Sequence, residues 1–71
     1  MLNAVVKNLL LNATKVCGPN VDEIMSYIME QLTPAAYKEI KSFLTWSFSN
    51  GKHFGWGNID EVYAEYKAQG A

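Results

Sequence analysis

Apolar residues recur at helical spacing in four segments of the chain. In the first segment, residues 2–16, they fall three, four and seven positions apart, which places them on one face of a helix. The residues of this face are Leu2, Val5, Val6, Leu9, Ala13 and Val16. Gly18 and Pro19 follow the segment. They end the helix, because glycine suits a left-handed cap and proline cannot continue the hydrogen-bond ladder.

Two central helices are marked by their start signals. Asn20 can cap the amides that follow it, and Glu23 supplies the second half of a capping box. Thr33 followed by Pro34 is typical of an N-cap with proline at the first helical position. The apolar residues of the two helices are Val21, Ile24, Met25, Ile28 and Leu32, then Ala36, Tyr37, Ile40, Phe43, Leu44, Ser47 and Phe48.

The last part of the chain predicts a loop followed by a fourth helix. Asn50-Gly51 ends the third helix, and residues 51–57 carry three glycines, which argues against regular structure. Asn58 and Glu61 then repeat the capping-box pattern. The helix that they open carries Ile59, Val62, Tyr63 and Tyr66, and we expect it to fray near Gly70.

These elements predict one fold class. No segment shows the strict alternation of apolar and polar residues that a half-buried strand needs. We therefore predict a single all-α domain over residues 1–71, a small bundle of four short helices. The alternative is a bundle of three helices with a docked C-terminal helical tail.

Composition narrows the class of protein. With 49 % hydrophobic and 18 % charged residues, the chain is too apolar for intrinsic disorder. So small a chain hides its apolar surface poorly, which predicts a partner or a homo-oligomer such as a homodimer. The single cysteine excludes an internal disulfide, the N-terminus is a poor signal peptide, and no apolar run is long enough for a membrane span. We therefore expect a cytoplasmic protein that does not enter a membrane.

Side chains suited to catalysis are few. His53 is the only residue that titrates near neutral pH without perturbation, and Cys17 is the only strong nucleophile. Nothing in the sequence places them together. The acidic pairs Asp22-Glu23 and Asp60-Glu61 each fall in the first turn of a predicted helix, where the helix dipole favours negative charge. Because no nucleotide-binding, EF-hand or zinc-protease motif is present, we predict no enzyme, no catalytic residue, no cofactor and no metal site.

The predicted loop carries a basic and aromatic motif, Lys52-His53-Phe54-Gly55-Trp56. This motif resembles the RNA-binding motif of cold-shock proteins, whose aromatic residues stack on bases. The resemblance is confined to this motif and implies that Phe54 and Trp56 are base-stacking residues. In that family the motif lies on a strand of a small barrel, whereas predicted helices flank it here. The chain also has no arginine and a net charge of −1, so we do not expect nucleic acid as the partner.

The two central helices allow a second interpretation. Joined by the Thr33-Pro34 turn, they could form a helix-turn-helix whose second helix enters a major groove. The residues that this helix would present are Lys38, Glu39, Lys41, Ser42 and Thr45. Two lysines around a glutamate make a weak recognition face, and they are explained more simply as the solvated side of an amphipathic helix. A compact DNA-binding regulator is therefore the alternative function.

Several large side chains fall outside the predicted core. At about 100° per residue, Leu11, Tyr27 and Trp46 lie away from the apolar faces of their helices. For Trp46 the alternative is an internal position, because a central helix packs against two neighbours. For the loop aromatics, the alternative is that one or both fold back to close the end of the bundle. Because aromatics are enriched in the anchors of interfaces, we predict a partner-binding surface made of Trp46, Trp56, Phe54 and Tyr27.

These observations favour a binding function. Small helical proteins without cofactors often act as inhibitors or adaptors, for example among phage-encoded proteins directed at host machinery. We predict a protein–protein interaction module that binds a partner protein through its aromatic surface, by occlusion or by recruitment.

Overall fold

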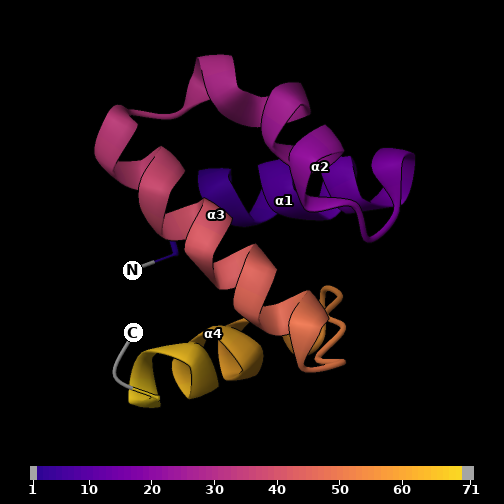
Figure 1. Cartoon of the computed structure of the whole chain (residues 1–71), viewed down its shortest axis with the longest axis vertical. Helices are drawn as coiled ribbons and strands as arrows, with labels where there is room; N and C mark the ends of the chain where they lie inside the picture. The colour runs from indigo at the N-terminus through magenta and orange to yellow at the C-terminus, as the bar shows by residue number, and fades with distance from the viewer. Residues whose placement is uncertain (1, 70–71) are drawn as a thin grey trace.

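The chain folds into four α-helices connected by short turns and one longer loop. The computed structural model describes residues 2–69, and over that range it contains no strand. The elements are α1 (Ala4–Cys17), α2 (Val21–Ile28), the 3-10 turn η1 (Met29–Gln31), α3 (Pro34–Ser49) and α4 (Ile59–Ala68). Each α-helix packs against the next one along the chain (Figure 1). The predicted all-α bundle of four short helices is confirmed, and the expected fraying near Gly70 lies outside the described residues.

The helix limits follow the predicted capping signals. The Asn20 side chain accepts a hydrogen bond from the Glu23 amide at 3.0 Å and begins α2. The Thr33 hydroxyl accepts one from the Ala36 amide at 3.1 Å, directly ahead of α3. Gly18 and Gly51 follow α1 and α3 with positive φ angles of 71° and 68°, a conformation that costs glycine least.

One start signal was missed, and one helix is shorter than predicted. The side chain of Asn3 accepts a hydrogen bond from the Val6 amide at 2.9 Å, so α1 begins at Ala4 rather than at Leu2. The second helix was expected to extend to Leu32, but α2 ends at Ile28 and tightens into the 3-10 turn η1.

The predicted core face of α1 is wrong at one edge, whereas Leu2, Val6, Leu9 and Ala13 lie in or against the core as predicted. Val5 and Val16 were placed in the core, but they are 68 % and 66 % exposed. Apart from Leu11, the side chains that face the core from this helix are Val6, Leu9, Leu10, Ala13 and Cys17. Their centre lies about a quarter turn away from Val5 and Val16. The apolar stripe of α1 is wider than the surface that its neighbours cover, and spacing alone does not show which edge of the stripe is left in water.

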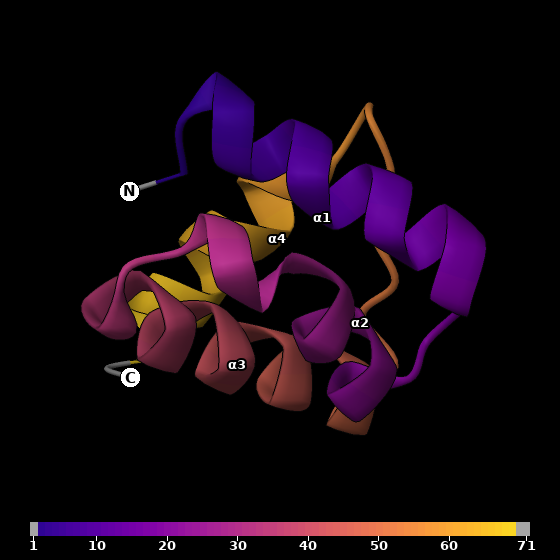
Figure 2. The ribbon, with the colours of Figure 1, turned by 90° about the horizontal axis from the view of Figure 1, so that it is seen from above.

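Leu11 was predicted to lie outside the core, and this prediction is also wrong. Leu11 is only 7 % exposed, although it projects from the side of α1 opposite to the expected stripe. The cause is tertiary, because the loop over residues 51–58 lies beside this part of α1 (Figure 2). Phe54, Gly55 and Trp56 of that loop line the same surface hollow as Leu11.

The centre of the core is a group of aromatic rings around Phe43. The Phe43 ring is fully buried, and its centroid lies 5.2 Å from that of Tyr63 and 5.4 Å from that of Tyr66, both on α4. Both contacts are edge-to-face, the geometry that aromatic pairs prefer. Fourteen buried apolar residues form one continuous cluster: Leu2, Leu10, Leu11, Ala13, Ile24, Met25, Ile28, Ile40, Phe43, Leu44, Ile59, Val62, Tyr63 and Tyr66.

A polar cluster joins α3 to α4 at the edge of this core. The Glu39 carboxylate accepts a hydrogen bond from the Tyr63 hydroxyl and forms an ion pair with the Lys67 ammonium at 3.0 Å. These two contacts, that of Tyr63 first, hold the pKa of Glu39 below its usual range. Burial, followed by the bond to Glu39, raises the pKa of Tyr63.

Glu39→Gln is expected to destabilise the protein at neutral pH and to have little effect in acid. A lowered pKa in the folded state stabilises the fold above the unfolded-state pKa, and this contribution is lost as the pH falls through the folded-state pKa. Because the Glu39 side chain is 36 % exposed, we expect a loss of only about 0.5 to 1 kcal/mol at pH 7. Urea denaturation at neutral and acidic pH measures this difference. Glu30→Gln, at an exposed glutamate outside the described ion pairs, is the matched control. An equal loss at both pH values for Glu39→Gln would contradict the assignment.

Candidate functional site

The loop over residues 51–58 joins α3 to α4 and is anchored by an aromatic side chain. The ring of Phe54 stacks on that of Phe43 at a centroid distance of 5.6 Å and on that of Phe48 at 5.9 Å. Phe54 is therefore half-buried and packed against the core. Of the two loop aromatics, this is the one that folds back to close the bundle.

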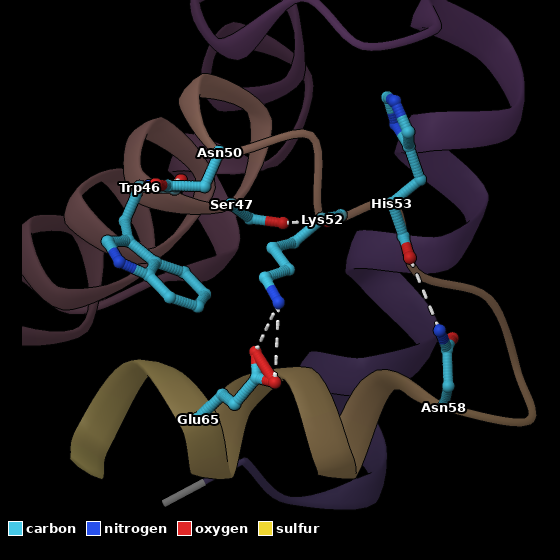
Figure 3. Close-up of polar contacts among 7 residues, drawn as sticks. All are labelled: Trp46, Ser47, Asn50, Lys52, His53, Asn58 and Glu65. Carbon is cyan, nitrogen blue, oxygen red and sulfur yellow. Dashed lines mark hydrogen bonds and ion pairs between the residues drawn. The ribbon is translucent and has the colours of Figure 1, made fainter. Parts of the chain in front are cut away.

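Hydrogen bonds fix the backbone of the loop at both ends. The buried Ser47 hydroxyl donates to the carbonyl of Lys52, and the Lys52 amide donates to the Ser47 carbonyl at 2.8 Å (Figure 3). At the other end, the Asn58 side chain accepts from the Gly55 amide at 2.7 Å and donates to the His53 carbonyl at 3.2 Å. These bonds hold the loop in one path between the two helices.

The predicted capping role of Asn58 is wrong. Its side chain is turned back into the loop, and α4 begins without a side-chain capping bond. The reason is local competition, because an asparagine side chain can bond the backbone of a turn as well as the first amides of a helix. Asn58 thus organises the loop, while the acidic residues Asp60 and Glu61 occupy the first turn of α4.

Two surface ion pairs connect the loop region to its surroundings. Lys52 pairs with Glu65 on α4 at 3.0 Å, as Figure 3 shows. Lys7 on α1 pairs with Asp60 at the start of α4 at 3.1 Å. Each pair is partly exposed and contributes little to stability. The first of them links the loop to α4, and the second links α1 to α4.

Trp56 lies in the same loop and projects into solvent. Its side chain is 69 % exposed, the highest value among the large apolar side chains of residues 2–69. It borders a hollow of about 370 Å³ between α1 and the loop. The hollow is lined by Leu11, Thr14, Lys15, Phe54, Gly55 and Trp56. Its two sides therefore come from segments that are far apart in the sequence.

The other two predicted binding residues lie in different places. Trp46 is half-buried, with its ring centroid 5.7 Å from that of Tyr66, and it lines a groove between α3 and α4. Tyr27, in the last turn of α2, is 51 % exposed and lines a hollow with Cys17, Asp22 and Glu23. The structure therefore brings Phe54 and Trp56 together, but it places neither Trp46 nor Tyr27 in their hollow.

The residues that were considered for nucleic-acid binding lie on α3 and in the loop over residues 51–58. Lys38, Lys41, Ser42 and Thr45 are exposed on α3, but Glu39 between the two lysines is bonded to Lys67 and Tyr63. The motif that resembles the RNA-binding segment of cold-shock proteins lies in a loop between helices. One of its two aromatic rings, that of Phe54, stacks on side chains of the core.

The remaining reactive side chains do not form a cluster. Cys17 is half-buried at the end of α1, and His53 is exposed with its ring 6.2 Å from that of Phe48. Within residues 2–69, no three His, Cys, Asp or Glu side chains lie close enough to hold a metal ion together. No helix in the same range has the length and apolar character needed to cross a membrane.

Sequence reasoning missed four residues of the hollow beside Trp56. Leu11 was noted only as a side chain outside the core, and Thr14, Lys15 and Gly55 were not considered as binding residues. The only sequence feature that could have indicated these residues is the spacing of Leu11 and Lys15, which places both side chains on one side of a helix. Comparison with known proteins gave no match to a family model, to a curated sequence or to a solved structure.

Proposed function

We propose that this chain is a small cytoplasmic protein–protein interaction module, an inhibitor or adaptor, that inserts Trp56 into a pocket of a partner protein. The single observation that supports this function is the 69 % exposure of Trp56 on a loop whose backbone is fixed. Exposing a large aromatic side chain is costly in water, and tryptophan is the residue most enriched at the energetic centres of interfaces.

Fixing the loop in the free protein favours tight binding. A mobile loop would lose conformational entropy when it is immobilised against a partner, which weakens the complex. Here the Phe54 ring and the side chains of Ser47 and Asn58 already hold the backbone on both sides of Trp56. Binding then needs to order little more than the indole itself.

Exposure favours Trp56 over Trp46 as the principal anchor. Trp46 packs against the core and Tyr66, so only part of its indole can contact another molecule. Tyr27 is exposed but lies in a separate hollow near α2. Phe54 contributes chiefly by positioning the loop, because its ring is stacked within the bundle.

Trp56→Ala is expected to abolish capture of the partner without unfolding the chain. The tagged protein is incubated with a nuclease-treated lysate of its native host, and the proteins retained are identified by mass spectrometry. The native chain should retain one protein in near-stoichiometric amount. Truncation of a central tryptophan should weaken that complex by at least about 30-fold, the effect of a strong interface anchor. The helical circular dichroism should be unchanged, because the Trp56 side chain is 69 % exposed and is not part of the buried core.

Tyr27→Ala is the matched control, since it removes another exposed aromatic from a different hollow. Loss of binding in Tyr27→Ala, with full binding in a folded Trp56→Ala variant, would move the site to α2 and refute the assignment of Trp56. Retention of nucleic acid in the absence of nuclease, lost with Lys38→Ala and Lys41→Ala, would favour the DNA-binding alternative instead.

A further inference from the structure

We infer that the hollow between α1 and the loop receives a peptide segment of the partner in which an apolar side chain lies beside an acidic one. This inference rests on the proposed function and names the chemistry of the segment that Trp56 contacts. It follows from the shape and from the charge of the hollow.

The floor of the hollow is apolar and open. Leu11 and the rings of Phe54 and Trp56 provide the apolar surface. The Thr14 hydroxyl also lines the hollow, but it already donates to the Leu10 carbonyl at 2.7 Å. At Gly55 a Cβ atom would meet no atom within 4 Å, so the space above this glycine is free for a side chain of another molecule. An apolar side chain of the partner bound there would remove from water both its own hydrophobic surface and that of the hollow.

Lys15 gives the hollow a positive charge without a counter-charge. It is the only charged residue among those that line the hollow. Among residues 2–69, carboxylates lie within ion-pair distance of Lys7, Lys52 and Lys67 but not of Lys15. The acids at the start of α2, Asp22 and Glu23, line a different hollow together with Tyr27. A carboxylate of the partner would therefore pair with Lys15 without displacing a carboxylate of this chain, whereas a basic segment would be repelled.

These features favour a peptide over a nucleic acid or a second copy of the chain. A single lysine beside the hollow cannot follow a phosphate backbone, which requires several positive charges. A second copy could present its own exposed Met29 next to Glu30. Such a contact would join two different surfaces, and it would build open chains of molecules unless the rotation happened to close into a ring. A separate partner is the simpler occupant.

A library of random peptides displayed on phage supplies the probe. Selection on the immobilised protein should enrich peptides with an aromatic or aliphatic residue within two positions of Asp or Glu. Gly55→Leu fills the hollow and should weaken the enriched peptides by at least about tenfold, since their apolar side chain loses its seat. Gly57→Leu is the matched control, because Gly57 is an exposed glycine of the same loop that also has free space around it and does not line the hollow.

Lys15→Glu tests the charge separately. This substitution should weaken the acidic peptides by at least about tenfold and should make a second selection enrich Lys or Arg beside the apolar residue. Enriched peptides that lose binding in Trp56→Ala but not in Lys15→Glu or Gly55→Leu overturn the inference and leave the proposed function intact. Peptides that bind all three variants equally, or the enrichment of no sequence, also overturn it. A dimer in sedimentation experiments that Gly55→Leu dissociates would overturn it in favour of a second copy.

Discussion

Phe43→Ala is expected to lower the free energy of unfolding by about 3 to 5 kcal/mol, the usual cost of truncating a fully buried phenylalanine. The Phe43 ring is 0 % exposed and contacts the rings of Phe54, Tyr63 and Tyr66. A chain of 71 residues has a total stability of about 4 to 10 kcal/mol at typical values per residue. The variant therefore loses a large part of its stability and lies close to the limit of folding.

Thermal denaturation followed by far-UV circular dichroism measures this loss. We expect the midpoint of Phe43→Ala to fall by about 15 °C or more, since each kcal/mol shifts a domain of this size by several degrees. Phe43→Leu keeps most of the apolar volume, so its midpoint should lie between those of Phe43→Ala and the native chain. Val5→Ala, at a side chain that is 68 % exposed, should change the stability by less than about 0.5 kcal/mol. Equal midpoints for Phe43→Ala and Val5→Ala would show that the aromatic group is not the centre of the core.

The helices could be predicted because their limits depend on local interactions. The hydrogen bonds that begin α2 and α3 join Asn20 and Thr33 to amides only three residues away. The ends of α1 and α3 need a residue with positive φ, which Gly18 and Gly51 supply. Such signals are complete within a few residues of sequence and do not depend on how the helices pack.

The exposed and buried faces of α1 could not be predicted in the same way. Val5, Val16 and Leu11 are all apolar residues on one helix, yet the two valines face water and the leucine is buried. What distinguishes them is the cover provided by other elements, above all by a loop that lies about forty positions later in the chain. Periodicity describes the helix but not its neighbours.

The candidate site was predicted only in part, because it too depends on how the loop packs against the helices. Phe54 and Trp56 were both named, and either of them could have closed the end of the bundle. The structure shows that the Phe54 ring stacks on two core phenylalanines while Trp56 stays exposed. Lys15 was not named, because its place beside Trp56 results from the path of the loop across α1. That path is stabilised by Asn58, whose sequence pattern indicated a helix cap.

Phe54→Ala is expected to reduce stability and partner binding together. The Phe54 ring is half-buried between Phe43 and Phe48, so its loss should cost about 2 to 3 kcal/mol of folding free energy. Without this anchor, the segment that carries Trp56 keeps only its hydrogen bonds and the exposed ion pair between Lys52 and Glu65. Binding of the partner must then order the loop again, which weakens the complex by about tenfold or more.

Comparison with Trp56→Ala separates the two roles. Both variants should bind the partner more weakly, but only Phe54→Ala should also unfold at lower urea concentration, because the Phe54 ring packs against the core whereas the Trp56 side chain is exposed. Phe54→Leu retains an apolar contact with the core and should recover part of both the stability and the binding. If Phe54→Ala remained folded and bound the partner as tightly as the native chain, the position of Trp56 would not depend on this anchor. A fixed loop would then be unnecessary for binding, and the argument from preorganisation would fail even if Trp56 itself contacted the partner.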